Sequence, residues 1–190
     1  VYLLSLLTLC TGLAGANTID RFSIVGAVRT LTQLFSYEAP FMLALLSPAI
    51  VAGSWQISEI ISQTGGQWAL LTQPVSFVVA LIGLMGKLEL PPFDAPEAET
   101  EIVAGALTEY SGRGYALFRL GRGVELVVGL TLIAALDFLA KTLGLLIILA
   151  LIQTLFARLR IDQTVGLWWR YGALLVLAQL AVIVGAQMVA

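Results

Sequence analysis

The sequence predicts an all-α protein, a polytopic bundle of transmembrane helices that forms a single domain over residues 1–190. Of the 190 residues, 59% are hydrophobic and only 12% are charged, and the mean hydropathy is +0.95. A soluble domain carries roughly 25% charged residues, so this chain lacks the polar surface that a water-soluble fold needs. Helices packed in lipid accept such a composition.

Six apolar segments approach the length of a membrane span, which needs about 20 mostly apolar residues. They are Val1–Ala14, Ala39–Trp55, Trp68–Met85, Tyr115–Leu136, Phe138–Ala157 and Val165–Ala190. We expect the second to extend backwards through IVGAVRTLTQLFSYE, which brings Glu38 and Arg29 to membrane depth. The first segment starts without Met or a basic leader, so we interpret it as the tail of a helix whose beginning is absent, an N-terminal truncation.

The basic residues predict the orientation of these helices. If the helices alternate strictly, nine of the ten Lys and Arg residues fall in or beside the loops on one side of the membrane. Only Lys141 falls on the other side. The positive-inside rule therefore places the basic side, with an acidic loop at 87–114, in the cytoplasm. We expect a multi-pass protein of the cytoplasmic (inner) membrane.

Residues that hold metals or cofactors are scarce, because the chain has no His and one Cys, Cys10. Haem held by paired histidines, iron–sulfur clusters and structural zinc need His or several Cys. We therefore expect no cofactor on this chain and any redox centre on partner subunits. Cys10 lies in an apolar run and is best explained as a packed small residue. The net charge of −2 gives no indication of nucleic-acid binding.

The stretch ELPPFDAPEAETEIVAGALTEYSGR, residues 89–113, gathers six carboxylates among small apolar residues. Asp94 followed by Glu97 matches a capping box, so we predict a helix over about 95–110. One face of this helix would carry, at i,i+4 spacing, Glu97, Glu101, Gly105 and Glu109. Like charges at that spacing repel. The alternatives are a solvated acidic helix beside the membrane and a half-buried site whose carboxylates hold or pass protons.

Charged residues also fall within the predicted spans. Glu38 precedes Pro40, and Arg119, Arg122 and Glu125 follow one another at i,i+3 spacing. Carboxylates at membrane depth indicate an ion or proton path, and a buried ion pair is the alternative for Glu38 and Glu125. Snorkelling to the lipid headgroups would equally explain both arginines.

These motifs resemble a known family. PFDAPEAETEIVAGALTEYSGR resembles the signature of the complex I subunit 1 (H-subunit) family, with its PFD-x-PEAE and EYSG elements. RTLTQLFSYE and RLRIDQ also resemble that family, and the charges of RLRIDQ, Arg160 and Asp162, could otherwise be ordinary loop charges. The family includes membrane subunits of group 4 energy-converting NiFe hydrogenases and formate hydrogenlyases. Its members have about eight transmembrane helices, which implies that further helices and an amphipathic segment precede Val1.

The resemblance implies roles for individual charges. Glu38 would be an intramembrane relay carboxylate, with Arg29 near it at the cytoplasmic side. The acidic loop would lie beside the redox module and begin a chain of charged residues through the membrane. The relay or coupling candidates are Glu38, Asp94, Glu97, Glu99, Glu101, Glu109 and Glu125. The supporting charges are Arg29, Arg113, Arg119, Arg122, Arg160 and Asp162.

One stretch departs from the quinone-reducing members of the family. Where those look like FFxGEY after EYSG, this chain reads FRLGRGVE. Arg119, together with GALTEYSG, is more similar to the hydrogenase branch. Arg122 stands where both branches commonly carry a carboxylate, and we expect Glu125, one turn later, to compensate.

We therefore expect a non-catalytic coupling subunit that anchors an iron–sulfur and NiFe-type catalytic arm and links electron transfer to proton or sodium translocation. Its expected partners are a NiFe-hydrogenase-like large subunit, an iron–sulfur small subunit and antiporter-like membrane subunits. The alternative is the H-subunit of a quinone-reducing complex I (NADH-quinone oxidoreductase). A passive anchor and a stand-alone secondary transporter are further alternatives, although we find no internal symmetry of the kind that transporters show.

Overall fold

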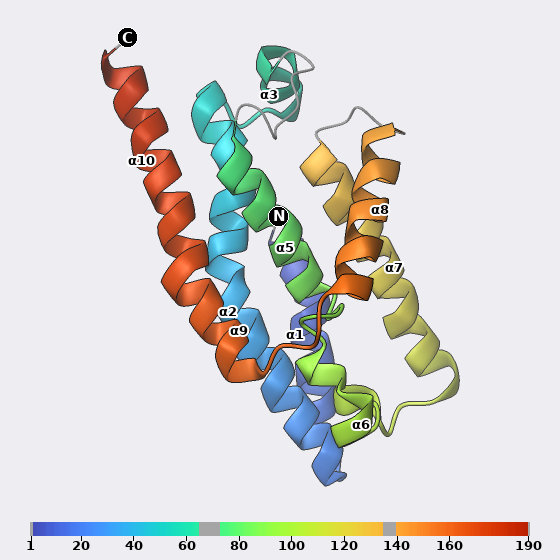
Figure 1. Ribbon diagram of the computed structural model, residues 1–190. Helices are drawn as coiled ribbons and strands as arrows, with labels where there is room; N and C mark the ends of the chain where they lie inside the picture. Colours follow the sequence, from blue (N-terminus) through green and yellow to red (C-terminus); the bar gives the residue numbers. More distant parts are fainter. Residues whose placement is uncertain (1, 65–72, 135–139, 190) are drawn as a thin grey trace.

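The computed structural model describes residues 2–64, 73–134 and 140–189. Within these residues the chain is helical and has no β-strand, so the predicted all-α class is confirmed. The long helices run side by side as a bundle (Figure 1). The short helix α3 (Ile57–Thr64) lies at one end of this bundle, and the acidic loop lies at the other (Figure 1).

Two helices form the N-terminal part of the bundle, α1 (Leu3–Ala16) and α2 (Arg21–Ala52). α2 begins after Asp20, whose carboxylate accepts hydrogen bonds from the backbone N–H groups of Phe22 at 3.1 Å and Ser23 at 3.2 Å. Such an N-cap satisfies donors that the first helical turn leaves without partners.

α2 is one helix of 32 residues, which confirms that the second apolar segment extends backwards through Glu38. It contains Pro40 and Pro48, each of which lacks the backbone N–H that an α-helix needs. Transmembrane helices tolerate such prolines because neighbouring groups satisfy the freed carbonyls. The helix ends at Gly53, whose φ of 63° is a left-handed conformation that glycine adopts without strain.

The remaining long helices are α5 (Pro74–Lys87), α7 (Gly112–Ala134), α8 (Ala140–Leu155) and α10 (Ala173–Val189). α10 continues from α9 (Ile161–Leu167) through a π-helical turn at Trp168–Gly172. These helices match the third to sixth apolar segments. The beginning of the third segment at Trp68 and the turn near Asp137 lie outside the described residues.

Two helical stretches, Arg21–Ala52 and Ile161–Gly185, are long and apolar enough by themselves to cross a membrane. Three further apolar helices are shorter, namely Leu3–Ala16, Pro74–Lys87 and Thr142–Leu155. An apolar helix shorter than the hydrocarbon thickness can still be inserted, with local thinning of the bilayer or association with other helices. The bundle is therefore consistent with insertion in a membrane.

α2 lies at the centre of the bundle and contacts α1, α5 and α10. A buried apolar cluster joins it to its neighbours, and Phe41 and Leu84 at its centre have no exposed surface. An added Cβ on Gly83 would meet the Phe41 ring, and one on Gly129 would meet the Leu84 side chain. Small residues of this kind let helices approach closely, which is how helices associate in membranes.

The acidic loop is not the single helix predicted over 95–110. It contains a 3₁₀ turn η1 (Ala95–Glu97), a one-turn helix α6 (Glu99–Ile102) and a second 3₁₀ turn η2 (Gly105–Leu107). Val103 and Gly105 have φ of 62° and 56°, which no α-helix contains. Asp94 makes no side-chain capping hydrogen bond, so the predicted capping box is also wrong.

Close packing on α2 explains this broken path. An added Cβ on Gly26 of α2 would meet backbone atoms of Gly105 and Ala106, so the loop backbone lies directly on the helix surface. The positive φ of Gly105 at this contact gives the loop a backbone path that an uninterrupted α-helix does not take. Tertiary contact therefore overrides the local helix signal of the loop.

Candidate functional site

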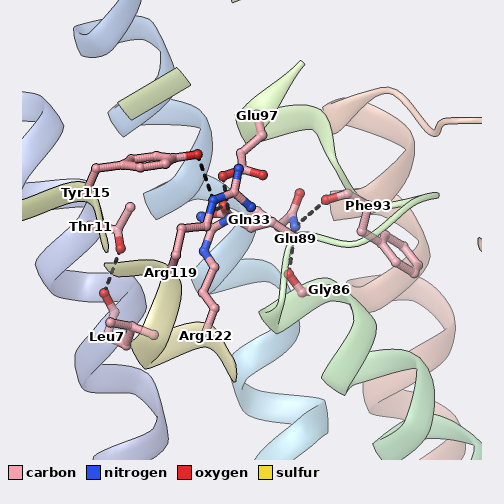
Figure 2. Close-up of polar contacts among 10 residues, drawn as sticks. All are labelled: Leu7, Thr11, Gln33, Gly86, Glu89, Phe93, Glu97, Tyr115, Arg119 and Arg122. Carbon is pink, nitrogen blue, oxygen red and sulfur yellow. Dashed lines mark hydrogen bonds and ion pairs between the residues drawn. The ribbon is translucent and has the colours of Figure 1, made fainter. Parts of the chain in front are cut away.

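Arg122 of α7 lies between two carboxylates of the acidic loop (Figure 2). Its Nη1 donates to Glu97 and its Nη2 donates to Glu89. The Arg122 side chain is 15% exposed and that of Glu89 only 4%, so the pair is largely removed from water. A guanidinium suits this position because its planar fork serves two acceptors and stays charged. We call these three residues the outer cluster.

Glu89 lies just after α5 and outside that helix. Burial raises the pKa of Glu89 above its usual value, although the positive charge of Arg122 opposes this. Nearby Glu97 raises it further, because two neighbouring carboxylates resist simultaneous ionisation. Glu89 stood among the six loop carboxylates of the sequence but not among the candidate site residues.

Lys87, the last residue of α5, is the cation of a second cluster. Its Nζ lies 3.6 Å from Oε2 of Glu38 and 3.7 Å from Oε1 of Glu125. The Lys87 side chain has no exposed surface, and Nζ lies 5.6 Å and 5.8 Å from the ring centroids of Tyr37 and Phe41. Aromatic faces attract a desolvated cation, so the rings help to hold the ammonium. We call Lys87, Glu38 and Glu125 the inner cluster.

Glu38 and Glu125 come from different helices, and both lie beside the same lysine; the Glu38 side chain is 22% exposed and that of Glu125 is 5% exposed. Glu38 on α2 also accepts a hydrogen bond from Oγ of Ser5 on α1. Sequence reasoning missed Lys87 because it stands at the end of an apolar segment, where a lysine usually reaches the headgroups. One signal could have indicated the role of Lys87: it is a cation at the end of an apolar helix, and two neighbouring helices contain carboxylates.

Arg29 does not lie beside Glu38 as the resemblance implied. Its Nη1 donates to Oε2 of Glu101 at 2.7 Å and to the backbone oxygen of Ala95 at 3.3 Å. The expected place of Arg29 is wrong because its side chain reaches out to the loop that packs on α2. The hydrogen bond and the charge of Arg29 lower the pKa of the exposed Glu101 carboxyl.

Asp94 contacts a residue that the candidate set did not include. Arg158, in the link between α8 and α9, donates from Nε to Oδ1 at 2.7 Å and from Nη2 to Oδ2 at 2.6 Å. The backbone N–H of Leu159, the residue after Arg158, donates to the backbone oxygen of Pro92, two residues before Asp94, at 2.9 Å. The beginning of the acidic loop is therefore fastened to the α8–α9 link.

Gln33 of α2 holds the same part of the loop from the other side (Figure 2). Its Nε2 donates to the backbone oxygens of Gly86 at 2.8 Å and Phe93 at 2.7 Å. Both ends of the turn that carries Glu89 are thus fixed to one buried amide. Sequence reasoning gave no sign of this role, because a lone Gln in a helix has many uses.

Two loop candidates lie apart from the clusters. Glu109 accepts a hydrogen bond from the backbone N–H of Asp20 at 2.7 Å and so joins the loop to the start of α2. Arg113 is exposed at the start of α7. The side chain of Glu99 lies outside the described residues. The expected stacking of Glu97, Glu101 and Glu109 on one helix face is wrong, because each contacts a different part of the bundle.

Three other charges lie at the surface. Arg119 donates from Nε to the Tyr115 hydroxyl at 2.7 Å and stacks on that ring at 5.2 Å (Figure 2). Arg160 and Asp162 form a 3.7 Å ion pair whose side chains are 81% and 80% exposed. Their exposure favours the interpretation of this pair as ordinary loop charges.

Two cavities adjoin the clusters. A small one of about 10 Å³ lies between them and is lined by Leu7, Thr8, Thr11, Lys87, Glu89, Arg122 and Glu125. A larger one of about 450 Å³ borders the outer cluster and is lined by Leu88, Glu89, Leu90, Pro91, Asp94, Glu97, Arg119, Arg122, Gly123, Leu126 and Arg158. Buried carboxylates beside such polar spaces can exchange protons with water.

Comparisons with known proteins agree with this fold. The family model described as NADH dehydrogenase matches residues 1–184. The chain belongs to this family, which is that of complex I subunit 1. The NADH-quinone oxidoreductase H-subunit of Carboxydothermus hydrogenoformans is 32% identical over 189 residues, covering 90% of this chain and 54% of that protein. An H-subunit of the same enzyme in Geobacter metallireducens is 35% identical over 172 residues, covering 83% and 52%.

A solved structure of the membrane-bound sulfane sulfur reductase, an archaeal respiratory membrane complex, has the same fold as this chain. The TM-score is 0.86 at 21% sequence identity, and the match covers 96% of this chain and 67% of the other. The family and this fold together identify a membrane subunit of the complex I type. The chain spans about half the length of the curated relatives named here.

The comparisons confirm the predicted complex I subunit 1 family and bear on the predicted branch. Both curated relatives are named as subunits of a quinone oxidoreductase. These names support the quinone-reducing alternative better than the hydrogenase branch that FRLGRGVE favoured. The NiFe-specific part of the prediction has no support from them.

Proposed function

We propose that this chain is the coupling part of the H-subunit in a complex I-like quinone oxidoreductase. It would link electron transfer in attached subunits to the movement of protons, or of sodium ions, across the membrane. The names of the curated relatives support the quinone-reducing assignment. The redox centres would belong to hydrophilic partner subunits, and antiporter-like subunits would adjoin this one in the membrane.

One observation carries the proposal: charged groups extend without a long gap from the acidic loop into the bundle. Arg122 joins Glu89 and Glu97 of the loop to α7, and Glu125 lies one turn further along the same helix. Lys87 then joins Glu125 to Glu38. Charges are expensive at membrane depth, so a connected set of them is better explained by ion transfer than by packing.

The acidic loop would face the redox subunits on the cytoplasmic side. A change of charge beside it would alter the balance at Glu97 and Glu89, and Arg122 would transmit the change to Glu125. Electrostatic effects of this kind act over several ångströms because the low dielectric of the interior screens them weakly. The chain itself would conduct no electrons.

The test replaces the carboxylate at the inner end of this path. In the full complex reconstituted in vesicles, Glu38→Gln is expected to lower the number of ions moved per electron far more than the rate of quinone reduction. Glu59→Gln is the matched control, because Glu59 is exposed on α3 at the other end of the bundle. An unchanged ion-to-electron ratio in Glu38→Gln would remove Glu38 from the mechanism.

A separate measurement distinguishes the quinone-reducing branch of the family from the hydrogenase branch. The complex that co-purifies with a tagged copy of this chain from native membranes is expected to contain iron without nickel. Stoichiometric nickel would instead establish a NiFe hydrogenase partner. Recovery of the chain as an active protein without partners or metal would favour a transporter.

A further inference from the structure

The inner cluster has an unusual geometry for an ion pair. Lys87 Nζ is within 4 Å of two carboxylates, yet among the described atoms it donates no hydrogen bond. The facing oxygens, Oε2 of Glu38 and Oε1 of Glu125, also have no hydrogen-bond partner there. Hydrogen bonds to an ammonium span about 2.7–2.9 Å. The ammonium therefore forms ion pairs with both carboxylates at closely similar distances and is hydrogen-bonded to neither.

Charge counting adds a second constraint. With both carboxylates ionised and Lys87 protonated, the inner cluster carries one surplus negative charge. Burial of an uncompensated charge costs several kcal/mol, even after relaxation of the surroundings. One additional proton on either carboxylate removes the surplus and leaves a neutral cluster. The ammonium then bonds the carboxylate that remains ionised.

We propose that Lys87 is an exchanging cation, which binds Glu38 and Glu125 in turn and so determines which of them holds the transferred proton. When Lys87 binds Glu38, the proton resides on Glu125. As the ammonium moves to Glu125, the Glu125 O–H bond breaks and its proton passes to a water molecule, which releases one of its own protons to form the new O–H bond on Glu38. Lys87 keeps its own three protons, and the net charge of the cluster stays at zero throughout. This step rests on the proposed coupling function and deepens it.

The surroundings permit this exchange. Lys87 is held by a flexible four-carbon stem, and its two ion-pair distances differ by only 0.1 Å, at 3.6 and 3.7 Å. A shift of about 1 Å or less would complete a hydrogen bond to one carboxylate and lengthen the contact with the other. The Tyr37 and Phe41 rings stabilise the ammonium in either position, because neither has a directional bond to it.

A small cavity provides a route for the proton between the inner and outer clusters. The cavity of about 10 Å³ lies against Lys87 and Glu125 on one side and Glu89 and Arg122 on the other. That volume is close to the minimum of about 10–15 Å³ that one water molecule needs, and the lining is polar enough to bind it. From α1, the buried hydroxyls of Ser5, Thr8 and Thr11 face the same region.

The titratable and charged groups that face the inner cluster come from four elements. They are Tyr37 and Glu38 on α2, Lys87 on α5, Glu89 in the loop, and Arg122 and Glu125 on α7. Any measurement of protonation must therefore separate the inner carboxylates from Glu89. Infrared difference spectroscopy of the C=O stretch does so when each carboxylate is replaced in turn.

The experiment uses the complete complex in vesicles and records both the ion-to-electron ratio and the redox-induced infrared difference in the carboxylic-acid C=O stretch. The wild type is expected to show a paired loss and gain of carboxylic-acid signal. Glu38→Gln and Glu125→Gln should each abolish both the loss and the gain, because no second carboxylate remains to exchange the proton. Lys87→Met should abolish both halves and lower the ratio to that of uncoupled vesicles, because both carboxylates then stay protonated.

A neutral variant covers the case in which Lys87→Met does not assemble. Lys87→Met combined with Glu38→Gln and Glu125→Gln buries no charge, so it is expected to assemble and reduce quinone without moving ions. Wild-type ion movement in Lys87→Met, or in this triple variant if the single one does not assemble, would overturn the exchange. If Glu38→Gln loses ion movement while Lys87→Met keeps it, only the exchange fails. If Glu38→Gln also keeps it, the proposed function fails as well.

Discussion

Asp94 and Arg158 are joined by two parallel hydrogen bonds of 2.7 and 2.6 Å, although 64 residues separate them in the sequence. The pair connects the beginning of the acidic loop to the link between α8 and α9. Asp94 fits the first turn of a helix by sequence, but its carboxylate reaches across to a guanidinium instead. A bidentate pair fixes direction as well as distance, so it holds the loop in one orientation.

Replacement of this arginine tests the bidentate geometry. Arg158→Lys keeps the charge but offers no planar fork, so we expect the pair to lose about 0.5–1 kcal/mol of stabilisation. The measurement is the thermal unfolding midpoint of the complex in detergent. Arg160→Lys is the control, because the Arg160 pair with Asp162 is exposed and should contribute little. Equal shifts in the two variants would show that the Asp94 pair has no special role.

The approach of the loop backbone to α2 gives a second prediction. Gly26→Ala places a methyl group against backbone atoms of Gly105 and Ala106, which cannot rotate away. Overpacking of this kind costs about 1–3 kcal/mol, and we expect the loop to lose its position first. Faster hydrogen exchange of the loop amides, with a lower unfolding midpoint, would register this.

Gly123→Ala provides the matched control for that change. Gly123 also lies in a helix, but an added Cβ there meets nothing within 4 Å. Alanine has the higher helix propensity, so this variant is expected to be neutral or stabilising by about 0.5–1 kcal/mol. If both alanine variants behaved alike, the close approach at Gly26 would not limit the packing of the loop.

The sequence predicts the helices of this bundle well because hydrophobic length determines them. The extension of α2 back through Glu38 followed from the need for a span of sufficient length, and the structure confirms it. Charges within apolar segments indicated that Glu38 and Glu125 lie inside the bundle, where their side chains are 22% and 5% exposed. These inferences use local composition only, which a single sequence contains in full.

The shape of the loop and the partners of each charge could not be predicted in the same way. The path of residues 95–110 depends on Gly26, which lies far earlier in the chain and gives no local signal. The resemblance implied that Arg29 lies near Glu38, yet its side chain turns to Glu101. Lys87 acquires its role from two other helices. Such pairings depend on tertiary contacts, which helix periodicity does not encode.

The outer cluster allows a test of what it costs to leave a buried carboxylate without its counter-charge. Arg122→Met removes the only described cation bonded to both Glu89 and Glu97, so one buried carboxylate loses its counter-charge. Loss of one member of a buried ion pair costs about 3–5 kcal/mol, and we expect a large fall in the unfolding midpoint. Addition of Glu89→Gln should restore much of the loss, because no unpaired buried charge remains. An unrescued double variant would mean that Arg122 acts through its packing alone.

The raised pKa of Glu89 makes stability depend on pH in a defined direction. Burial is the main cause of the raised pKa, so the folded chain binds this proton more tightly than the unfolded chain does. Below the usual glutamate pKa of about 4.5 both states are protonated, and burial of the ionised form costs nothing. As the pH rises from there through the folded-state pKa, this carboxyl contributes a growing loss of stability.

Glu89→Gln should remove that dependence, because an amide does not titrate in this range and its oxygen can still accept from Arg122. We expect the difference in unfolding midpoint between variant and wild type to shift in favour of the variant as the pH rises above about 4.5. Comparison with wild type cancels the opposite trend of groups such as Glu101, whose pKa is lowered by Arg29. Glu59→Gln, at an exposed position on α3, should give a parallel curve. If the unfolding midpoint of Glu89→Gln also ran parallel to that of wild type across this pH range, the Glu89 carboxyl would titrate in the folded chain as it does in the unfolded chain.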